Sequence, residues 1–119
     1  MNILFLCTAN QHRSWTAQDL LIAIDKSNHY KSAGLSRKYV HKAGSTLCTL
    51  EMLDWADKIF VFEDAHTKRI QEYTGEKYLS KITNLDIEDN FTFFQRQLVL
   101  LILEKCVIDQ IQQTILRTK

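Results

Sequence analysis

A cysteine and an arginine six residues apart stand at the two ends of a short segment near the N-terminus. The segment reads Cys7-Thr8-Ala9-Asn10-Gln11-His12-Arg13-Ser14. A cysteine thiolate is a nucleophile, and an arginine guanidinium can give two parallel hydrogen bonds to phosphate oxygens. With this spacing, one loop can hold both the nucleophile, Cys7, and the anion-binding group, Arg13. Attack of a thiolate on a bound phosphate ester is therefore the first chemistry that we expect.

The chain around this segment places it where a phosphate group can bind. Ile3 to Leu6 are four consecutive apolar residues, which is typical of a strand buried on both faces of a parallel sheet. From Ser14 the apolar residues recur at helical spacing, so the segment becomes the turn between a strand and a helix. Backbone N–H groups of such a turn point inward and, with the helix dipole, form an anion site. We therefore expect inorganic phosphate or sulfate to occupy this loop, and the same donors to stabilise the Cys7 thiolate.

Strands and helices alternate along the rest of the chain. Further buried strands are predicted at Tyr30 to Ala33, Ile59 to Phe62 and Ile82 to Leu85. Helices are predicted over Ser14 to Ile24, Leu47 to Ala56, Asp64 to Tyr73 and Thr92 to Leu116, with Leu35 to Ser45 as a loop. The order predicts an α/β fold in one domain, residues 1–119. We expect an open four-stranded parallel sheet with helices on both faces and a phosphate-binding loop after strand one, where such sheets bind ligands.

The charge and cysteine content exclude several other classes of protein. The chain has 15 Lys and Arg against 14 Asp and Glu, and the basic residues are scattered. We therefore expect neither a nucleic-acid partner nor binding to a membrane surface. The longest apolar run, Leu98 to Leu103, is far shorter than the ~20 residues of a membrane helix, and Ile3 to Leu6 is too short for a signal-peptide core, so we expect a cytoplasmic protein. Three cysteines without a C-x-x-C pair or metal-ligand spacing predict reduced thiols, no metal and no cofactor.

The first segment resembles the N-terminal signature of the low-molecular-weight protein tyrosine phosphatase family, in particular of its short bacterial members. The matching residues run from Ile3 to Ala17. Three later segments match in order: Ser32-Ala33-Gly34, Ala56-Asp57-Lys58-Ile59-Phe60-Val61-Phe62 and Leu85-Asp86-Ile87-Glu88-Asp89-Asn90-Phe91. The resemblance implies a cysteine-dependent phosphatase that hydrolyses phosphotyrosine or related aryl phosphate monoesters through a phosphocysteine intermediate.

The resemblance also implies roles for single residues. By motif position, Cys7 is the nucleophile, Arg13 the phosphate clamp and Ser14 a hydroxyl donor to the thiolate. Asn10 would hold the loop in its left-handed conformation, which Asn tolerates better than most residues do. The phosphate-binding set implied by the motif comprises Thr8, Ala9, Asn10, Gln11, His12, Arg13 and Ser14.

A general acid is implied on a distant loop. The Asp-Pro-aromatic segment of the family maps best onto Asp89-Asn90-Phe91, so Asp89 is the expected catalytic acid and Asp86 the alternative. This carboxyl group would protonate the leaving phenolate and then activate water against the phosphocysteine. Phe91 either walls an aromatic substrate pocket or packs in the core.

Some positions depart from the family pattern. Trp15 and Asn90 stand where the family has proline, which leaves open how efficient turnover is. His12 stands where many members carry a second cysteine, so the chain lacks the disulfide that protects an oxidised nucleophile. The role of His12 is left open between a ring that faces solvent and one that modulates the charge of the thiolate.

The remaining cysteines and histidines carry less signal. Cys48 and Cys106 fall on apolar helical stripes and are predicted to be core residues. The other three histidines, among them His66, lie in polar segments and carry no signal. From Leu98 to Ile115 the apolar residues wrap more than one helical face, which favours a homodimer or another helix contact.

Three other functions share this kind of loop. A thioredoxin-linked arsenate reductase has the same loop and fold but needs further redox cysteines near the site. A phosphoryl-carrier domain of a sugar phosphotransferase system also has a cysteine after its first parallel strand, although Arg13 would trap the phosphoryl group there. A phosphate-binding module without turnover is the alternative from a different class. The sequence leaves open whether the substrate is a phosphotyrosine protein or a small aryl phosphate.

Overall fold

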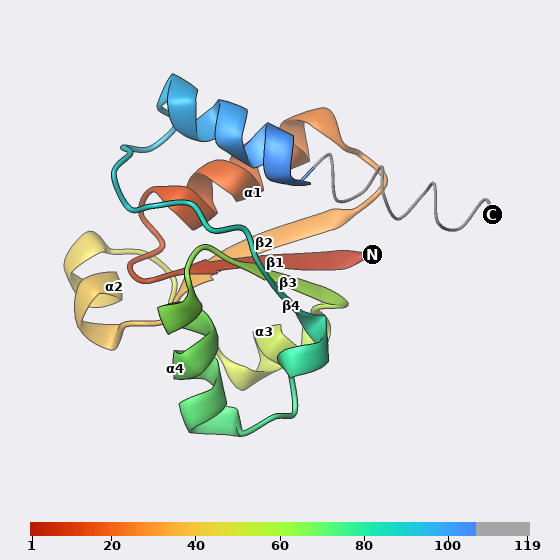
Figure 1. Ribbon diagram of the computed structural model, residues 1–119, viewed down its shortest axis with the longest axis vertical. Helices are drawn as coiled ribbons and strands as arrows, with labels where there is room; N and C mark the ends of the chain where they lie inside the picture. Colours follow the sequence, from red (N-terminus) through yellow and green to blue (C-terminus); the bar gives the residue numbers. More distant parts are fainter. Residues whose placement is uncertain (107–119) are drawn as a thin grey trace.

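A four-stranded parallel sheet forms the centre of the protein (Figure 1). The structure is a computed structural model, and it describes residues 1–106. The strands are β1 (Asn2–Cys7), β2 (His29–Gly34), β3 (Lys58–Val61) and β4 (Ile82–Asn84), in the order β2-β1-β3-β4. All neighbouring strands are parallel, and β1 is a central strand. The predicted open, four-stranded parallel sheet is confirmed.

Helices cover both faces of this sheet. They are α1 (Arg13–Ile24), α2 (Arg37–Ala43), α3 (Leu50–Trp55), α4 (Asp64–Thr74), the short 3-10 helix η1 (Leu79–Lys81) and a last described helix over residues 96–106. In Figure 1, α1 and the last described helix, drawn in blue, lie on one side of the sheet, and α3 and α4 lie on the other. No helix within residues 1–106 is long and apolar enough to cross a bilayer.

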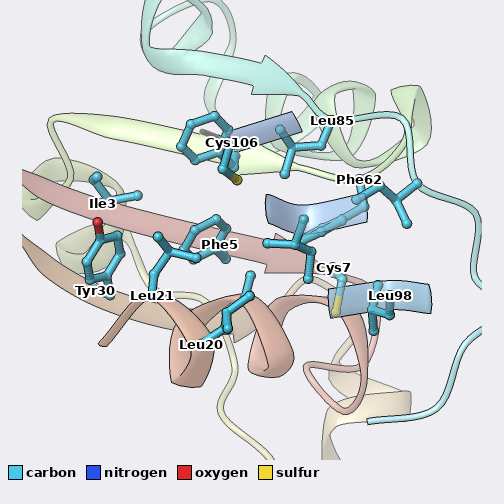
Figure 2. Close-up of a cluster of buried hydrophobic side chains, with 14 residues drawn as sticks. Ile3, Phe5, Cys7, Leu20, Leu21, Tyr30, Phe62, Leu85, Leu98 and Cys106 are labelled. Atoms are coloured by element: carbon cyan, nitrogen blue, oxygen red, sulfur yellow. The ribbon is translucent and has the colours of Figure 1, made fainter. Parts of the chain in front are cut away.

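Strand β1 divides the core into two layers because its side chains alternate between the two faces of the sheet. Ile3, Phe5 and Cys7 belong to one buried cluster, with residues of α1 and of the last described helix (Figure 2). Leu4 and Leu6 belong to the other cluster, with residues of α3 and α4. Each of these five residues is at most 3% exposed. Burial of each large apolar side chain contributes roughly 1.5–3 kcal/mol, so the strand that leads into Cys7 is firmly held.

Residues 35–45 do not form the loop that the sequence predicts, because α2 lies within them. The side chain of Ser36 accepts a hydrogen bond from the N–H of Tyr39 at the start of α2, and Gly44 ends the helix with a left-handed φ of 67°. Val40 is the one buried residue in this helix. A helix with one buried residue has no apolar stripe, so its hydrophobic periodicity gives no signal.

The helix predicted from Leu47 begins later, at Leu50. Leu47 forms a parallel bridge with Gly34, and the N–H of Cys48 donates to the carbonyl of Gly34, so this segment is extended. Cys48 is therefore half-buried in the connection before α3 and does not belong to a helical stripe, contrary to the prediction. The side chain of Thr49 caps α3.

The helix predicted over residues 92–116 also begins later. The N–H of Gln95 donates to the carbonyl of Thr92 in a turn, and the helix starts at residue 96. Cys106 is buried in this helix as predicted, in the same cluster as Leu98 and Ile102. The rest of the predicted helix, and with it part of the apolar surface behind the expected dimer contact, lies outside the described residues.

Gly34 allows β2 and the loop after β1 to approach closely. A Cβ atom at this position would lie 2.8 Å from the carbonyl oxygen of Thr8 and 2.4 Å from Cγ2 of Val40. The N–H of Leu35 donates to the carbonyls of Cys7 and Thr8 at 2.9 and 3.1 Å. Any side chain at position 34 would therefore push on this loop, so close packing requires glycine here.

Candidate active site

The loop between β1 and α1 borders a cavity of about 480 Å³. The residues that line it come from this loop, from α2 and from the segment after β4, and they are Cys7, Thr8, Ala9, Gln11, His12, Arg13, Tyr39 and Asp89. The structure thus brings together the predicted nucleophile, phosphate clamp and acid with most of the predicted phosphate loop. Asn10 and Ser14, the other two predicted loop residues, are buried behind this surface.

Ser14 lies against the thiol of Cys7. The Sγ of Cys7 and the Oγ of Ser14 are 2.9 Å apart. The Nδ2 of Asn10 donates to the same Ser14 oxygen at 2.8 Å. Because this oxygen already accepts a hydrogen bond, its own proton can point at the sulfur and stabilise a thiolate there. This is the geometry that the predicted donor role of Ser14 requires.

Asn10 ties the loop to β2 and to the segment before α3. Its φ of 52° is left-handed, as the motif implies. Its Nδ2 also donates to the hydroxyl of Ser32 at 2.9 Å, and its Oδ1 accepts from the N–H of Thr46 at 3.3 Å. The Ser32 hydroxyl in turn donates to Gln18 on α1 at 2.8 Å. The shape of the loop is therefore fixed by the protein itself before any anion binds.

The backbone of the loop is rich in unused donors. In the part of the chain that the structure describes, the N–H groups of residues 8–13 have no protein acceptor. They lie at the start of α1, where the helix dipole is positive. Unpaired N–H groups at a helix N-terminus bind phosphate-sized anions. The loop thus has the donors that a phosphate dianion requires.

Arg13 is buried, with 2% of its side chain exposed, and three segments contact its guanidinium. Its Nη1 donates to Oε2 of Glu63 at 2.8 Å and to the carbonyl of Ile87 at 3.0 Å. Both protons of Nη1 are therefore used, and the edge formed by Nε and Nη2 remains for two parallel bonds to an oxyanion. The ring of Phe62 lies on one side of this group, with its centroid 5.8 Å from Cζ.

Glu63 balances the charge of Arg13, and the motif does not indicate it. The hydrogen bond from Arg13 holds the pKa of the Glu63 carboxyl below its usual value, so this group is ionised at neutral pH. Glu63 also occupies the N-cap position of α4. Its side chain makes no capping bond, because it is turned to Arg13 instead.

The structure separates the two candidate acids. Asp89 lines the cavity, and its Oδ1 is 3.7 Å from Nε of Arg13. Its side chain is 61% exposed, so water and a leaving group can reach it. Asp86 does not line this cavity. It has a left-handed φ of 54°, and its carbonyl accepts a hydrogen bond from Nζ of Lys105. Asp89 is thus the carboxylate that shares a cavity with Cys7.

Aromatic residues attach the segment that carries Asp89 to the start of α1. The ring of Trp15 packs against Phe93 at 5.5 Å between centroids. The N–H of Phe94 donates to the hydroxyl of Thr16 at 2.9 Å. Trp15 stands where the family resemblance implies a proline, and in this chain its ring contacts the segment that follows Asp89.

The sequence allows two interpretations each for His12 and Phe91. His12 is half-buried at the cavity, and its Nδ1 is buried without a hydrogen-bond partner in the described part of the chain, so the ring does not simply face solvent. Phe91 packs against the buried cluster of β1 and α1 and does not line the cavity, which favours its core role.

His66 is a site residue that no pattern in the sequence indicates. It is 3% exposed, and its Nδ1 accepts a hydrogen bond from the N–H of Phe62 at 3.2 Å. An accepting Nδ1 leaves the ring proton on Nε2, which donates to the hydroxyl of Thr8 at 3.1 Å. Thr8 directly follows Cys7, so α4 holds the start of the loop through this histidine. Burial, together with the charge of Arg13, lowers the pKa of His66 to about 4.

Topology offers one signal that could have indicated Glu63 and His66. Glu63 lies two residues beyond β3 and His66 in the first turn of α4, and the carboxyl ends of parallel strands lie at the same edge of a sheet. Polar residues just beyond β3 must therefore lie near the loop after β1. Within residues 1–106, no three His, Cys, Asp or Glu residues are grouped so that they could hold a metal ion, and none of the three cysteines there forms a disulfide.

The sequence matches no protein-family model and no curated protein, whereas the fold matches several solved structures. The YwlE arginine phosphatase from Geobacillus stearothermophilus is 24% identical, with a TM-score of 0.73 over 99% of this chain and 97% of that chain. The low-molecular-weight protein tyrosine phosphatase SP-PTP from Streptococcus pyogenes is 17% identical, with a TM-score of 0.75 over 94% and 91% of the two chains. The tyrosine phosphatase Wzb from Escherichia coli K30, in complex with phosphate, is 20% identical, with a TM-score of 0.68 over 87% and 91%. The chain therefore has the fold of the low-molecular-weight protein tyrosine phosphatases.

Replacement of His66 by Gln should weaken the dependence of stability on acid pH. The pKa of this imidazole is about 4 in the folded protein against 6.5 for an ordinary histidine, so its contribution is complete above pH 6.5 and is lost as the pH falls toward 4. The free energy of unfolding that His66 contributes should therefore fall by about 3 kcal/mol between pH 7 and pH 4. Urea unfolding at pH 7 and pH 4 measures it: the difference in unfolding free energy should be smaller in His66→Gln than in the wild type. His41→Gln, at an exposed position, serves as the control. An unchanged difference in His66→Gln would contradict the burial of a neutral ring.

Proposed function

We propose that the protein is a cysteine-dependent phosphatase that hydrolyses phosphate monoesters, with Cys7 as its nucleophile. One observation supports this most directly. Cys7, whose thiol has the Ser14 hydroxyl 2.9 Å away, lines the same cavity as Arg13 and Asp89, and Oδ1 of Asp89 is 3.7 Å from Nε of Arg13. A nucleophile, an oxyanion clamp and a proton donor are the three groups that phosphoryl transfer to a thiolate needs.

In the first step, the phosphate dianion of the substrate lies in the loop. The N–H groups of residues 8–13 and the Nε and Nη2 of Arg13 bind its oxygens. The Cys7 thiolate attacks phosphorus, so the S–P bond forms while the P–O bond to the leaving group breaks. Asp89 enters this step protonated and gives its proton to the leaving oxygen. The products are a phosphocysteine and the released alcohol.

In the second step, water hydrolyses the phosphocysteine. The Asp89 carboxylate takes a proton from the water, whose oxygen bonds to phosphorus as the S–P bond breaks. Inorganic phosphate leaves, and the thiolate is restored. The Ser14 hydroxyl stabilises sulfur both as nucleophile and as leaving group, because negative charge develops on the same atom in the two steps.

For the substrate, we propose phosphotyrosine or a related aryl phosphate. Tyr39 of α2 lines the cavity, and its half-exposed ring can pack against an aromatic leaving group. The likeness to the YwlE arginine phosphatase supports a second candidate, a phosphorylated arginine side chain. A comparison of kcat/KM for a phosphotyrosine peptide and for the matching phosphoarginine peptide separates the two candidates.

A phosphate-binding module without turnover is the alternative, because it would use the same loop and Arg13. Arsenate reduction is less well supported. It would require redox cysteines near the nucleophile, but Cys48 lines a different cavity and Cys106 is buried in the core. Neither of them lines the cavity of Cys7.

Turnover of p-nitrophenyl phosphate tests the phosphatase proposal. The wild type should release nitrophenol, and Cys7→Ser should not, because a serine hydroxyl is a far weaker nucleophile than a thiolate. Arg13→Lys should lower kcat/KM by about 10²- to 10³-fold, since an ammonium cannot give two parallel bonds to the phosphoryl group. Circular dichroism of each variant checks the fold. If the wild type binds phosphate but shows no more turnover than Cys7→Ser, the binding module replaces the phosphatase.

The acid is tested by a pair of variants. Asp89→Asn should lower kcat/KM for a phosphotyrosine peptide far more than for p-nitrophenyl phosphate, because nitrophenolate leaves without a proton. Asp86→Asn, outside the cavity, should behave like the wild type on both substrates. If Asp86→Asn shows the leaving-group-dependent loss of kcat/KM and Asp89→Asn does not, the acid is Asp86. If Asp89→Asn lowers kcat/KM equally on both substrates, Asp89 is not the acid.

A further inference from the structure

The cavity of Cys7 is the first of three neighbouring cavities, of which the second lies beside α2 and α4 and the third lies between α4 and residues 47–53, with Arg37 of α2 at its edge. A second cavity, of about 240 Å³, shares Thr8 and Tyr39 with the first. A third, of about 250 Å³, shares Leu35 and Arg69 with the second. We refer to the second and third cavities together as the α2–α4 groove. Because each cavity shares lining residues with the next, the groove adjoins the candidate active site.

One face of α4 forms a wall of the groove over its whole length. Ala65 and His66 line the second cavity, Arg69 lines both, and Ile70 and Tyr73 line the third. Their spacing of three and four residues places them along one side of a helix. The nine residues from Ala65 to Tyr73 are separated by eight helical steps, which span about 12 Å at ~1.5 Å per step. An extended peptide covers this length with three to four residues, at ~3.3–3.6 Å each.

The charge in the groove becomes positive with distance from the active site. Near the site the groove contains Glu63, whose charge is balanced by Arg13 at 2.8 Å. Farther along, Arg69 and Arg37 are exposed, and within residues 1–106 no carboxylate lies within 4 Å of either. Arg69 packs over the ring of Tyr73, with Cζ 5.4 Å from the centroid, so its charge lies beside this ring. The groove is thus suited to an acidic side chain at Arg69 and Arg37.

The far end of the groove is apolar. Leu53 and Ile70 are buried beneath it, at 5% and 3% exposure. Leu50 and Tyr73 stand at its rim and are 62% and 74% exposed. An enclosed apolar floor with exposed apolar side chains at the rim fits one aliphatic side chain better than a second charged one.

We propose that the α2–α4 groove binds the polypeptide next to the phosphorylated residue of a protein substrate. An acidic side chain of that segment pairs with Arg69 and Arg37, and an aliphatic side chain about four residues from the phosphorylated residue enters the far cavity. This proposal rests on the proposed phosphatase function and makes it specific, because it assigns the enzyme to phosphoproteins with acidic flanking sequence. Small aryl phosphates occupy the first cavity alone and gain nothing from the groove.

Kinetics on substrates of different length tests the groove. The substrates are p-nitrophenyl phosphate and two phosphotyrosine peptides. In one peptide, aspartate stands two positions and leucine four positions before the phosphotyrosine. In the other, the same residues stand at the same distances after it. Since the groove leaves the site in one direction, one peptide should be preferred. For that peptide, Arg69→Glu should lower kcat/KM about tenfold, and less at high salt, while kcat/KM for p-nitrophenyl phosphate stays unchanged. Leu50→Ser should lower kcat/KM for the same peptide and not for its leucine-to-serine version.

Lys68→Glu is the matched control, because this substitution makes the same change of charge. Lys68 is the exposed neighbour of Arg69 on α4 and lines neither cavity of the groove. The substitution should leave kcat/KM for the peptide at the wild-type value. The proposal would be overturned if Lys68→Glu and Arg69→Glu lowered kcat/KM for the peptide equally. It would also be overturned if both peptides had the same kcat/KM and Arg69→Glu changed neither value.

Binding separates this proposal from the proposed function. Fluorescence anisotropy of the same labelled phosphopeptides with the Cys7→Ser protein needs no turnover. If no phosphate ester is hydrolysed but the preferred peptide still binds, and Arg69→Glu weakens it about tenfold, the groove stands and the phosphatase function fails. If esters are hydrolysed but neither affinity nor kcat/KM responds to the flanking residues, the groove fails and the phosphatase function stands. Absence of both turnover and peptide binding would overturn both.

Discussion

The buried charge of Arg13 is the constraint on which the site depends. Its side chain is 2% exposed, and a charge buried without partners costs several kcal/mol. The partners are Glu63, directly after β3, and the carbonyl of Ile87, in the segment after β4. Satisfying one guanidinium therefore brings the starts of α1 and α4 together with the segment that carries Asp89. Because these partners use Nη1, they also leave a fixed edge of the guanidinium directed away from them, for an oxyanion.

A second set of interactions fixes the other end of the loop around Cys7. Asn10 donates hydrogen bonds to the hydroxyls of Ser14 in α1 and Ser32 in β2. His66 of α4 forms a hydrogen bond with the hydroxyl of Thr8. Each of these bonds joins the loop to a regular element, so little rearrangement is needed when a phosphate dianion binds. Groups positioned in advance stabilise a transition state better than groups that must reorganise during the reaction. Rigidity here is therefore part of the proposed chemistry.

Local patterns predict the sheet and the loop, but not the groups that complete the site. The apolar run of β1 followed by the C-x5-R-S motif indicates the strand, the loop and the helix together, since all lie within 24 residues. Helix α2 gives no periodic signal because only one of its residues, Val40, is buried, so the helix has no repeating apolar positions. Glu63 and His66 contact residues that are 50 and 58 positions away, and no local pattern records such a contact. These two residues could have been indicated only by the rule that the carboxyl ends of parallel strands lie at the same edge of the sheet.

The central claim, that the loop presents the Cys7 thiolate to a phosphate dianion, is tested most directly by alkylation. The rate of reaction with iodoacetate at neutral pH is measured for each cysteine by mass spectrometry, with and without inorganic phosphate. Cys7 should react first, and phosphate should slow Cys7 alone, because thiolates react and the anion covers this sulfur. Cys48 should react slowly, since burial raises its pKa to about 12. Equal rates for Cys7 and Cys48, with no effect of phosphate on either, would contradict the claim.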